Sequence, residues 1–339
     1  QARRPQNALA TLTNTAFGVG ELARYRFGID PVPAQPTEGN EIPFGAEGQW
    51  IDPAMIDPRA HQIHVGYAHE LWANTTLSVD FSHHEVRNEK RQININPIIN
   101  GQRRLAPDFQ RVFGIPDRLS NVLILAPINE ARYDALTFLV QRRTPRATLQ
   151  AHYTLSSAYA YGGTFANFTG GGNNAGGGSS RPMIWDQPNT DEEWGPAQTD
   201  ERHRFVFLGV FELPYGLQVS PVIQAASARP YNLIAGTDLN RDGLNNDRYI
   251  DPNTGQQVHV NAGRGDNTFL FDLRTTKFLS FGGGRQLGLF FELFNVLNTV
   301  NHGNLYNGNG RAANFRQPTG YIQSIGYPRQ LQLGARFLF

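Results

Sequence analysis

The sequence predicts an all-β fold, an antiparallel transmembrane β-barrel, and three observations support this prediction. Apolar and polar residues alternate with a period of two through long segments, as expected for strands with one face in lipid and the other lining a lumen. Short turns and long loops alternate strictly along the chain. Charged residues make up only 17% of the 339 residues, whereas the chain has 35 Gly and 22 Phe, a composition that favours strands and turns.

Nine segments follow the alternation and are predicted to be strands. Each is long beside the roughly 5–6 residues of an ordinary strand and suits a tilted bilayer span of about 9–11 residues. In the last segment the apolar positions are Leu331, Leu333, Ala335, Phe337 and Phe339. The nine segments are 61–70, 74–84, 131–143, 146–158, 202–213, 216–228, 267–281, 285–297 and 328–339.

The connections set the expected topology. Short turns at 70–74, 143–146, 213–216 and 281–285 alternate with long segments at 85–130, 159–201, 229–266 and 298–327. Outer-membrane barrels have short periplasmic turns and long extracellular loops, so we assign the two sets to those sides. A glycine-rich stretch at 162–180 is expected to be a flexible loop tip.

Two regions differ in the strength of this pattern. Residues 1–60 are weakly patterned, with a candidate strand within 11–28 and a long loop at 29–60, whereas residues 61–339 carry the barrel strands and loops. About nine to ten strands are therefore expected, as part of a larger barrel. Ten strands would also suffice to close a small barrel whose side chains fill the lumen.

Several protein classes are disfavoured. No run of 18 apolar residues occurs and the mean hydropathy is -0.43, which argues against transmembrane helices. A net charge of +1 gives no reason to expect nucleic acid as a partner, and no catalytic constellation is present, so the chain is not expected to be an enzyme. A soluble β-sandwich or β-solenoid also alternates, but it would normally have shorter strands and loops of similar length at both ends.

Charged residues on the polar sides of the strands are expected to line the lumen, where they pair with one another or contact a plug. Their simplest interpretation is solvated lumen charge, and no ligand contact is assigned to them. These residues are Arg204, Glu212, Asp272, Arg274, Glu292 and Arg336.

One loop has the spacing of a calcium site. Residues 238–243 fit the pattern D-x-[DN]-x-[DN]-G, in which alternate oxygen ligands converge on Ca²⁺. The twelfth position is Tyr249 rather than a bidentate Glu, and a polar turn-forming loop without metal is the competing interpretation. The candidate ligands are Asp238, Asn240, Asp242, Asp247 and Asp251. The histidine pairs His61/His64 and His83/His84 lack a convincing third ligand and are interpreted as strand residues.

Ordered motifs extend this interpretation: Asp200-Glu201-Arg202-His203-Arg204, Leu213-Pro214-Tyr215-Gly216, Asn246-Asp247-Arg248 and Glu292-Leu293-Phe294-Asn295. With them the chain resembles the Oar-like TonB-dependent receptors of the bacterial outer membrane, well over about 130–339 and loosely over 60–130. The resemblance implies the C-terminal barrel portion of a receptor or transporter with roughly twenty-two strands. It also implies extracellular loops that capture an unknown ligand, and TonB as a partner through a plug that this chain lacks.

The final strand carries a further expectation. Phe337 and the terminal Phe339 resemble the C-terminal signal that the barrel-assembly machinery reads, although an ordinary edge strand also ends in this way. The expected surroundings of the barrel are outer-membrane lipid. The alternative functions are a structural or surface-interaction β protein without transport, either a small outer-membrane barrel or a secreted assembly.

Overall fold

A computed structural model gives the fold of most of the chain. It describes residues 9–14, 19–26, 46–96, 98–99, 101–113, 119–161, 193–239, 245 and 247–339. The glycine-rich stretch at 162–180 lies outside the described residues.

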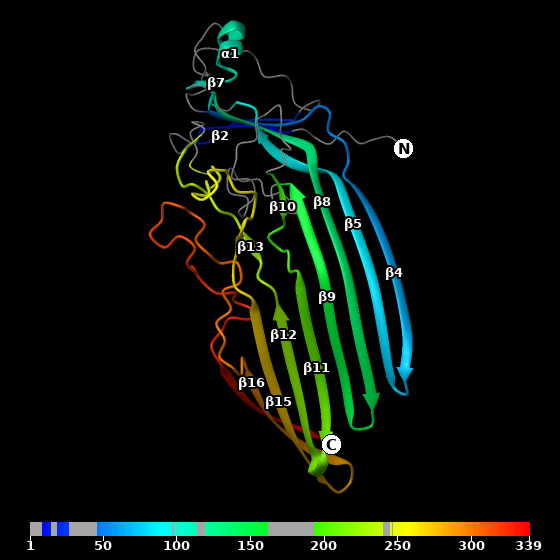
Figure 1. Ribbon diagram of the computed structural model, residues 1–339. Helices are drawn as coiled ribbons and strands as arrows, with labels where there is room; N and C mark the ends of the chain where they lie inside the picture. Colours follow the sequence, from blue (N-terminus) through cyan, green and yellow to red (C-terminus); the bar gives the residue numbers. More distant parts are fainter. Residues whose placement is uncertain are drawn as a thin grey trace.

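Nine long strands form one curved antiparallel meander (Figure 1). Each strand pairs with the next one along this series, and all nine predicted segments are confirmed as strands. The strands are β4 (Arg59–Trp72), β5 (Thr75–Asn94), β8 (Leu119–Thr144), β9 (Ala147–Tyr161), β11 (His203–Leu213), β12 (Leu217–Ala226), β15 (Thr268–Phe281), β16 (Arg285–Phe294) and β17 (Gln330–Leu338).

The short connections all lie at one end of the sheet, the lower end in Figure 1. They are residues 73–74, 145–146, the 3-10 turn η2 (Pro214–Gly216) and residues 282–284. Tyr215 and Gly216 take the left-handed φ values of 64° and 71° that this tight turn requires. We call this end the turn end. The long connections lie at the opposite end, the loop end, as the predicted alternation requires.

The strand register separates an apolar face from a polar face. Side chains of directly paired residues point to the same side of a sheet, so a row of partners can be followed from strand to strand. One apolar row crosses seven strands through Tyr67, Val79, Phe138, Tyr153, Phe205, Ala225 and Phe269. The adjacent polar row crosses the same strands through Gly66, Asp80, Thr137, Thr154, Arg204, Ala226 and Thr268.

The apolar face is the exposed one. Leu331, Leu333 and Phe337 on β17 are 58%, 71% and 51% exposed. Most of the described apolar residues that are buried are small or lie at the loop end, such as Ala158, Leu233 and Val260. A soluble sandwich would bury its alternating apolar face against a second layer. The structure shows the inverted arrangement that the sequence predicts for strands in lipid.

The first part of the chain differs from the expected single strand and loop. Two short strands, β1 (Leu9–Asn14) and β2 (Val19–Arg26), pair as an antiparallel hairpin. A third strand, β3 (Ala46–Ile51), pairs with β1 and runs parallel to the first residues of β8. The sheet is therefore not antiparallel throughout, because β8 extends far enough beyond β9 to accept this extra neighbour.

The segment predicted as a long loop at 85–130 is also more ordered than expected. β5 and β8 continue their pairing into it as far as Asn94 and Leu123. The short strands β6 (Ile98–Ile99) and β7 (Gln102–Arg103) and the helix α1 (Ala106–Phe113) follow within it. Within the described part of the chain, no helix has the length and apolar character needed to cross a membrane.

The sheet does not close on itself. Among the described strands, β4 pairs only with β5 and β17 pairs only with β16, so these two strands form the edges of the meander. Both run from the loop end to the turn end (Figure 1), and pairing them directly would give a parallel contact. The alternative of a small barrel closed by about ten strands is therefore wrong for the described strands, which form an open curved sheet.

Candidate functional site at the loop end

The six charged residues predicted to line a lumen all take polar-face positions in the strand register. Arg274 lies 3.4 Å from the Glu292 carboxylate, with its guanidinium 4.5 Å from the centre of the Phe290 ring. The Gln218 amide donates to Glu212 at 2.6 Å. These contacts are the ones expected of charged side chains that pair with polar neighbours along the polar face.

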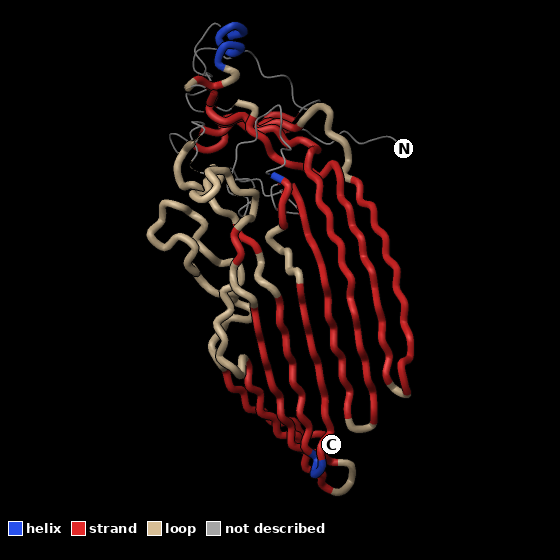
Figure 2. The backbone as a smooth tube through the Cα atoms, in the orientation of Figure 1, coloured by secondary structure: helices blue, strands red, loops and turns tan. Residues whose placement is uncertain are grey.

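Long connections gather into an ordered body at the loop end, drawn in tan in Figure 2. We call the described residues 193–202, 227–239, 245, 247–267 and 295–329 the loop cluster. It contains the short strands β10 (Trp194–Pro196), β13 (Pro230–Tyr231) and β14 (Gly263–Arg264). Side-chain hydrogen bonds between distant segments hold it, and four groups of contacts define its geometry.

A buried ion pair lies at the centre of the loop cluster. The side chains of Arg248 and Glu193 are 0% and 2% exposed, and the Arg248 Nη2 donates to Glu193 Oε1 at 2.5 Å. The Arg248 Nη1 also donates to Asn232 Oδ1 at 3.3 Å. Paired and hydrogen-bonded charges are the form in which ions are tolerated inside a protein. This contact joins three segments that are remote in sequence.

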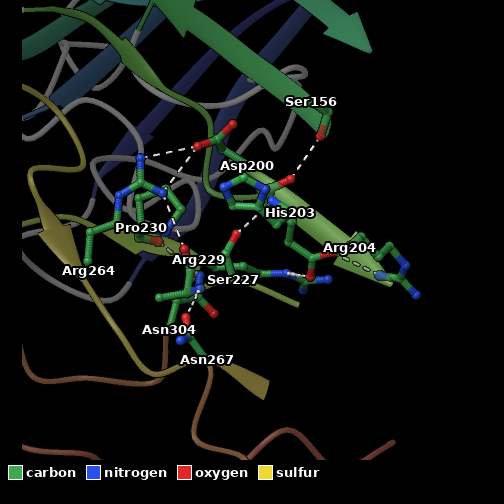
Figure 3. A network of polar contacts seen from close by, with 12 residues as sticks. Ser156, Asp200, His203, Arg204, Ser227, Arg229, Pro230, Arg264, Asn267 and Asn304 are labelled. Atoms are coloured by element: carbon green, nitrogen blue, oxygen red, sulfur yellow. Dashed lines mark hydrogen bonds and ion pairs between the residues drawn. The ribbon is translucent and has the colours of Figure 1, made fainter. Parts of the chain in front are cut away.

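A second ion pair attaches the loop cluster to β9 (Figure 3). The Asp200 carboxylate is almost fully buried and accepts two hydrogen bonds from Arg264, both at 3.1 Å. Its other oxygen accepts the backbone N–H of Ala158 in β9 at 2.9 Å. Asp200 therefore fixes the entry to β11 against the end of β9.

Two asparagines fix the last long connection to the sheet. The Asn301 side chain accepts the Phe269 N–H at 2.8 Å and donates to Phe269 O and Ile325 O. The Asn295 side chain donates to Thr299 O and Tyr327 O in the same manner. Side-chain amides thus satisfy backbone groups that no strand partner reaches, and the connection is held close to β15.

A tyrosine and a carboxylate form the fourth group. The Tyr306 hydroxyl donates to Asp266 Oδ2, and its ring stacks on Tyr231 with centroids 5.3 Å apart. Burial, followed by the hydrogen bond and charge of Asp266, raises the pKa of Tyr306 to about 12. The neutral hydroxyl is therefore the form that the folded loop cluster stabilises.

The pKa of Tyr306 gives a prediction at alkaline pH. Because the folded pKa lies above the unfolded value of about 10, the stabilisation is complete below pH 10 and is lost as pH rises through about 12. A titration of tyrosinate absorbance should show a step near pH 12. Tyr306→Phe is expected to remove that step, whereas Tyr215→Phe in the exposed turn should retain it. A step near pH 12 that survives unchanged in Tyr306→Phe would contradict the assignment.

A cavity of about 370 Å³ lies between the loop cluster and the polar face of β11, β12 and β15. Glu201 lies in its wall, between Arg204 of β11 and Arg229 of the loop cluster. Glu201 Oε2 accepts the Arg204 Nη1 at 2.8 Å, and Oε1 accepts the Arg229 Nε at 2.7 Å. The cavity is thus bordered by two guanidinium groups and one carboxylate.

The structure describes part of the predicted calcium loop. Asp247 is buried and accepts the Leu239 N–H at 2.5 Å, and Asp251 accepts the backbone N–H of Asn253 at 2.9 Å. Asn240 and Asp242 lie outside the described residues. Among the residues that are described, no group of three or more acidic, histidine or cysteine side chains is arranged to hold a metal ion. Calcium binding by Asp238, Asn240, Asp242, Asp247 and Asp251 stays a prediction.

The terminal aromatic residues lie at the turn end. Phe337 is on β17, and its ring stacks with that of Phe339 at a centroid distance of 6.1 Å. Their role as an assembly signal stays a prediction. The histidines have local partners, with His83 Nδ1 2.7 Å from Asp134 Oδ1 and His64 Nδ1 2.8 Å from Ser82 Oγ.

Sequence reasoning assigned no role to the residues that organise the loop cluster. Glu193, Asp200, Arg248, Arg264 and Asn301 lie in connections that were expected only to be long. Asp200 and Arg248 stand in two motifs of the family resemblance, at 200–204 and 246–248, but these motifs assign them no partner. The density of Asp, Asn and Arg in those connections is shared by ordinary turns. Their pairing is a property of the folded chain.

Comparison with known families matches residues 1–249 to the family described as outer membrane beta barrel domain. Comparison with curated proteins finds no match. Among solved structures, the outer membrane transporter YddB from Escherichia coli is similar at 12% identity and a TM-score of 0.49, over 84% of this chain and 33% of that one.

Two further solved structures resemble the chain. The ferric-catecholate import receptor Fiu from E. coli matches at 11% identity and a TM-score of 0.45, over 90% of this chain and 29% of that one. The FrpB iron transporter from Neisseria meningitidis matches at 11% identity and a TM-score of 0.45, over 84% and 32%. The chain spans about a third of the length of these structures.

Proposed function

Because this chain belongs to the outer membrane beta barrel domain family, we propose that it forms a section of the wall of an outer-membrane receptor or transporter. It is a protein of the bacterial outer membrane. In the proposed arrangement the turn end lies in the periplasm, and the loop cluster lies outside the cell, where it captures a ligand.

One observation carries the proposal: the sheet leaves its apolar face exposed, with Leu331, Leu333 and Phe337 at 58%, 71% and 51%, and an ordered loop cluster lies at one end of that sheet. The apolar face suits contact with lipid, whereas the loop cluster has buried ion pairs at Arg248–Glu193 and Arg264–Asp200. Such an ordered polar body at one end of a lipid-facing sheet offers a preorganised surface to a ligand. The sheet is curved (Figure 1), as the wall of a barrel is, and the proposal places its polar face on the inside.

The two edge strands support a section rather than a complete barrel. In lipid every backbone N–H and C=O must be paired, so open edges are not tolerated there. Among the described strands, none pairs with the outer side of β4 or of β17, so both need further strands, which the proposal assigns to the rest of a larger barrel. A plug inside that barrel would meet the polar-face charges, and contact with TonB would follow through the plug.

Orientation can be tested by cysteine labelling, because the chain has no native cysteine. Thr254→Cys places a thiol on an exposed part of the loop cluster, and Gly282→Cys places one in an exposed turn at the turn end. A membrane-impermeant maleimide added to intact cells that produce the full protein should label the first variant. The second should react only after the outer membrane is permeabilised. Labelling of Gly282→Cys in intact cells, with Thr254→Cys protected, would overturn the proposed orientation.

A further inference from the structure

The cavity beneath the loop cluster has the chemistry of a carboxylate site. We propose that Arg204 and Arg229 bind the carboxylate of a small organic acid in this cavity, with Leu270, Ile322 and Ile325 against its apolar body. The inference deepens the proposed function, since it names the chemical class of a ligand that enters from the loop end. The inference rests on the proposed function only in placing the loop end outside the cell, so that the ligand enters from there.

Donor groups remain available in the cavity wall. Arg204 uses its Nη1 and Arg229 its Nε to reach Glu201. Among the residues that the structure describes, the Nε and Nη2 of Arg204 and both Nη atoms of Arg229 have no other hydrogen-bond partner. Guanidinium groups recognise carboxylates through paired, charge-assisted hydrogen bonds. Because two guanidinium groups face one carboxylate, the cavity wall keeps one net positive charge, which a ligand carboxylate can neutralise.

The charged groups are held in place before any ligand arrives. The Ser156 hydroxyl of β9 donates to the Glu201 carbonyl oxygen at 2.8 Å, and the Ser156 N–H donates to Arg202 O at 3.0 Å. Figure 3 shows this anchoring beside Asp200, with Arg204 and Arg229 extending from the same network. The Glu201 side chain is 11% exposed, whereas those of Arg204 and Arg229 are 46% and 35% exposed. The carboxylate is therefore the fixed member, and the guanidinium groups face the open space.

The rest of the wall favours an organic body on the acid. Leu270 of β15 is 8% exposed and lines the cavity together with Ile322 and Ile325. Asn301 fixes this wall by donating to Ile325 O at 2.7 Å. A volume of about 370 Å³ lies at the lower end of the range for small-molecule sites, about 300–1,000 Å³. The cavity thus suits a compact acid with an apolar part.

Benzoate is a suitable probe, with benzamide as its neutral isostere and acetate as the acid without the ring. Calorimetric titration of the purified, folded full protein in detergent should show benzoate binding, with benzamide and acetate each at least about tenfold weaker. Arg204→Gln and Arg229→Gln should each weaken benzoate binding about tenfold or more. Glu201→Gln should tighten it, because the competing carboxylate is removed.

The tightening in Glu201→Gln separates ligand binding from a structural role, since loss of a merely structural ion pair would weaken binding or leave it unchanged. Arg311→Gln, an exposed arginine of the loop cluster outside the cavity, is the matched control and should bind as the parent does. Heat-modifiable gel migration reports that each variant is folded. Equal binding of benzamide and benzoate, a loss in Arg311→Gln equal to that in Arg204→Gln, or no benzoate binding by the folded full protein would overturn the inference. These outcomes leave the cysteine-labelling result untouched, so the two proposals fail separately.

Discussion

Replacing Arg248 with Met is expected to destabilise the loop cluster by about 3–5 kcal/mol, the usual loss when one partner of a buried ion pair is removed. The change leaves the Glu193 carboxylate, 2% exposed, without the guanidinium that contacts it at 2.5 Å. Met fills much of the volume of Arg, so the loss reports charge and hydrogen bonding more than packing. Asn232 also loses a donor at 3.3 Å.

Native-state hydrogen exchange is the appropriate measurement, because the effect is local to the loop cluster. The Ile234 N–H is bonded to Gly308 O and the Tyr249 N–H to Leu233 O, and both should lose protection in Arg248→Met. Amides of β9 and β11 outside the loop cluster should change little.

Arg311→Met is the matched control, since Arg311 is exposed in the same loop cluster. Its effect should stay within about 0.5 kcal/mol, as for most surface substitutions. Removing both charges with Glu193→Leu and Arg248→Met should be less harmful than the two single changes added together. If the Ile234 N–H is equally protected from exchange in Arg248→Met and in Arg311→Met, the buried ion pair does not hold the loop cluster.

The strands could be predicted from the sequence because their environment is repeated at every second residue. An exposed apolar face on one side and polar neighbours on the other impose the same choice along β17, so Leu331, Gln332 and Leu333 carry the information locally. The short turns were equally local, since Gly216 supplies a positive φ that the tight turn at Tyr215–Gly216 requires. These two signals set the order of all nine long strands.

The loop cluster could not be predicted in the same way, because its contacts join residues far apart in the chain. Glu193 meets Arg248 across 55 positions and Asp200 meets Arg264 across 64, and no local pattern specifies such partners. The parallel contact of β3 with β8 is likewise a long-range event, decided by the unpaired length of β8. The cavity at Glu201 depends on the contacts of the loop cluster, since it exists only where the loop cluster covers the sheet.

Replacing Leu333 with Arg is expected to cost about 2–4 kcal/mol if the side chain lies near the bilayer midplane. Leu333 is in the middle of β17, on the apolar face, and its partner across the strand pair is Phe291. A guanidinium at this position loses its hydration in the hydrocarbon region. The measurement is the equilibrium between the full protein unfolded in denaturant and the full protein folded into lipid vesicles.

The neighbouring Gln332→Arg is the matched control, because the same charge is added one residue away on the opposite face. Gln332 pairs with Glu292, which lies 3.4 Å from Arg274, so a new guanidinium there meets a carboxylate and water instead of hydrocarbon. Its effect should be small. The difference between the two variants isolates the environment of the two faces, since strand, charge and side-chain length are shared. Equal losses in both would mean that the apolar face does not contact lipid, and the barrel assignment of this sheet would fail with it.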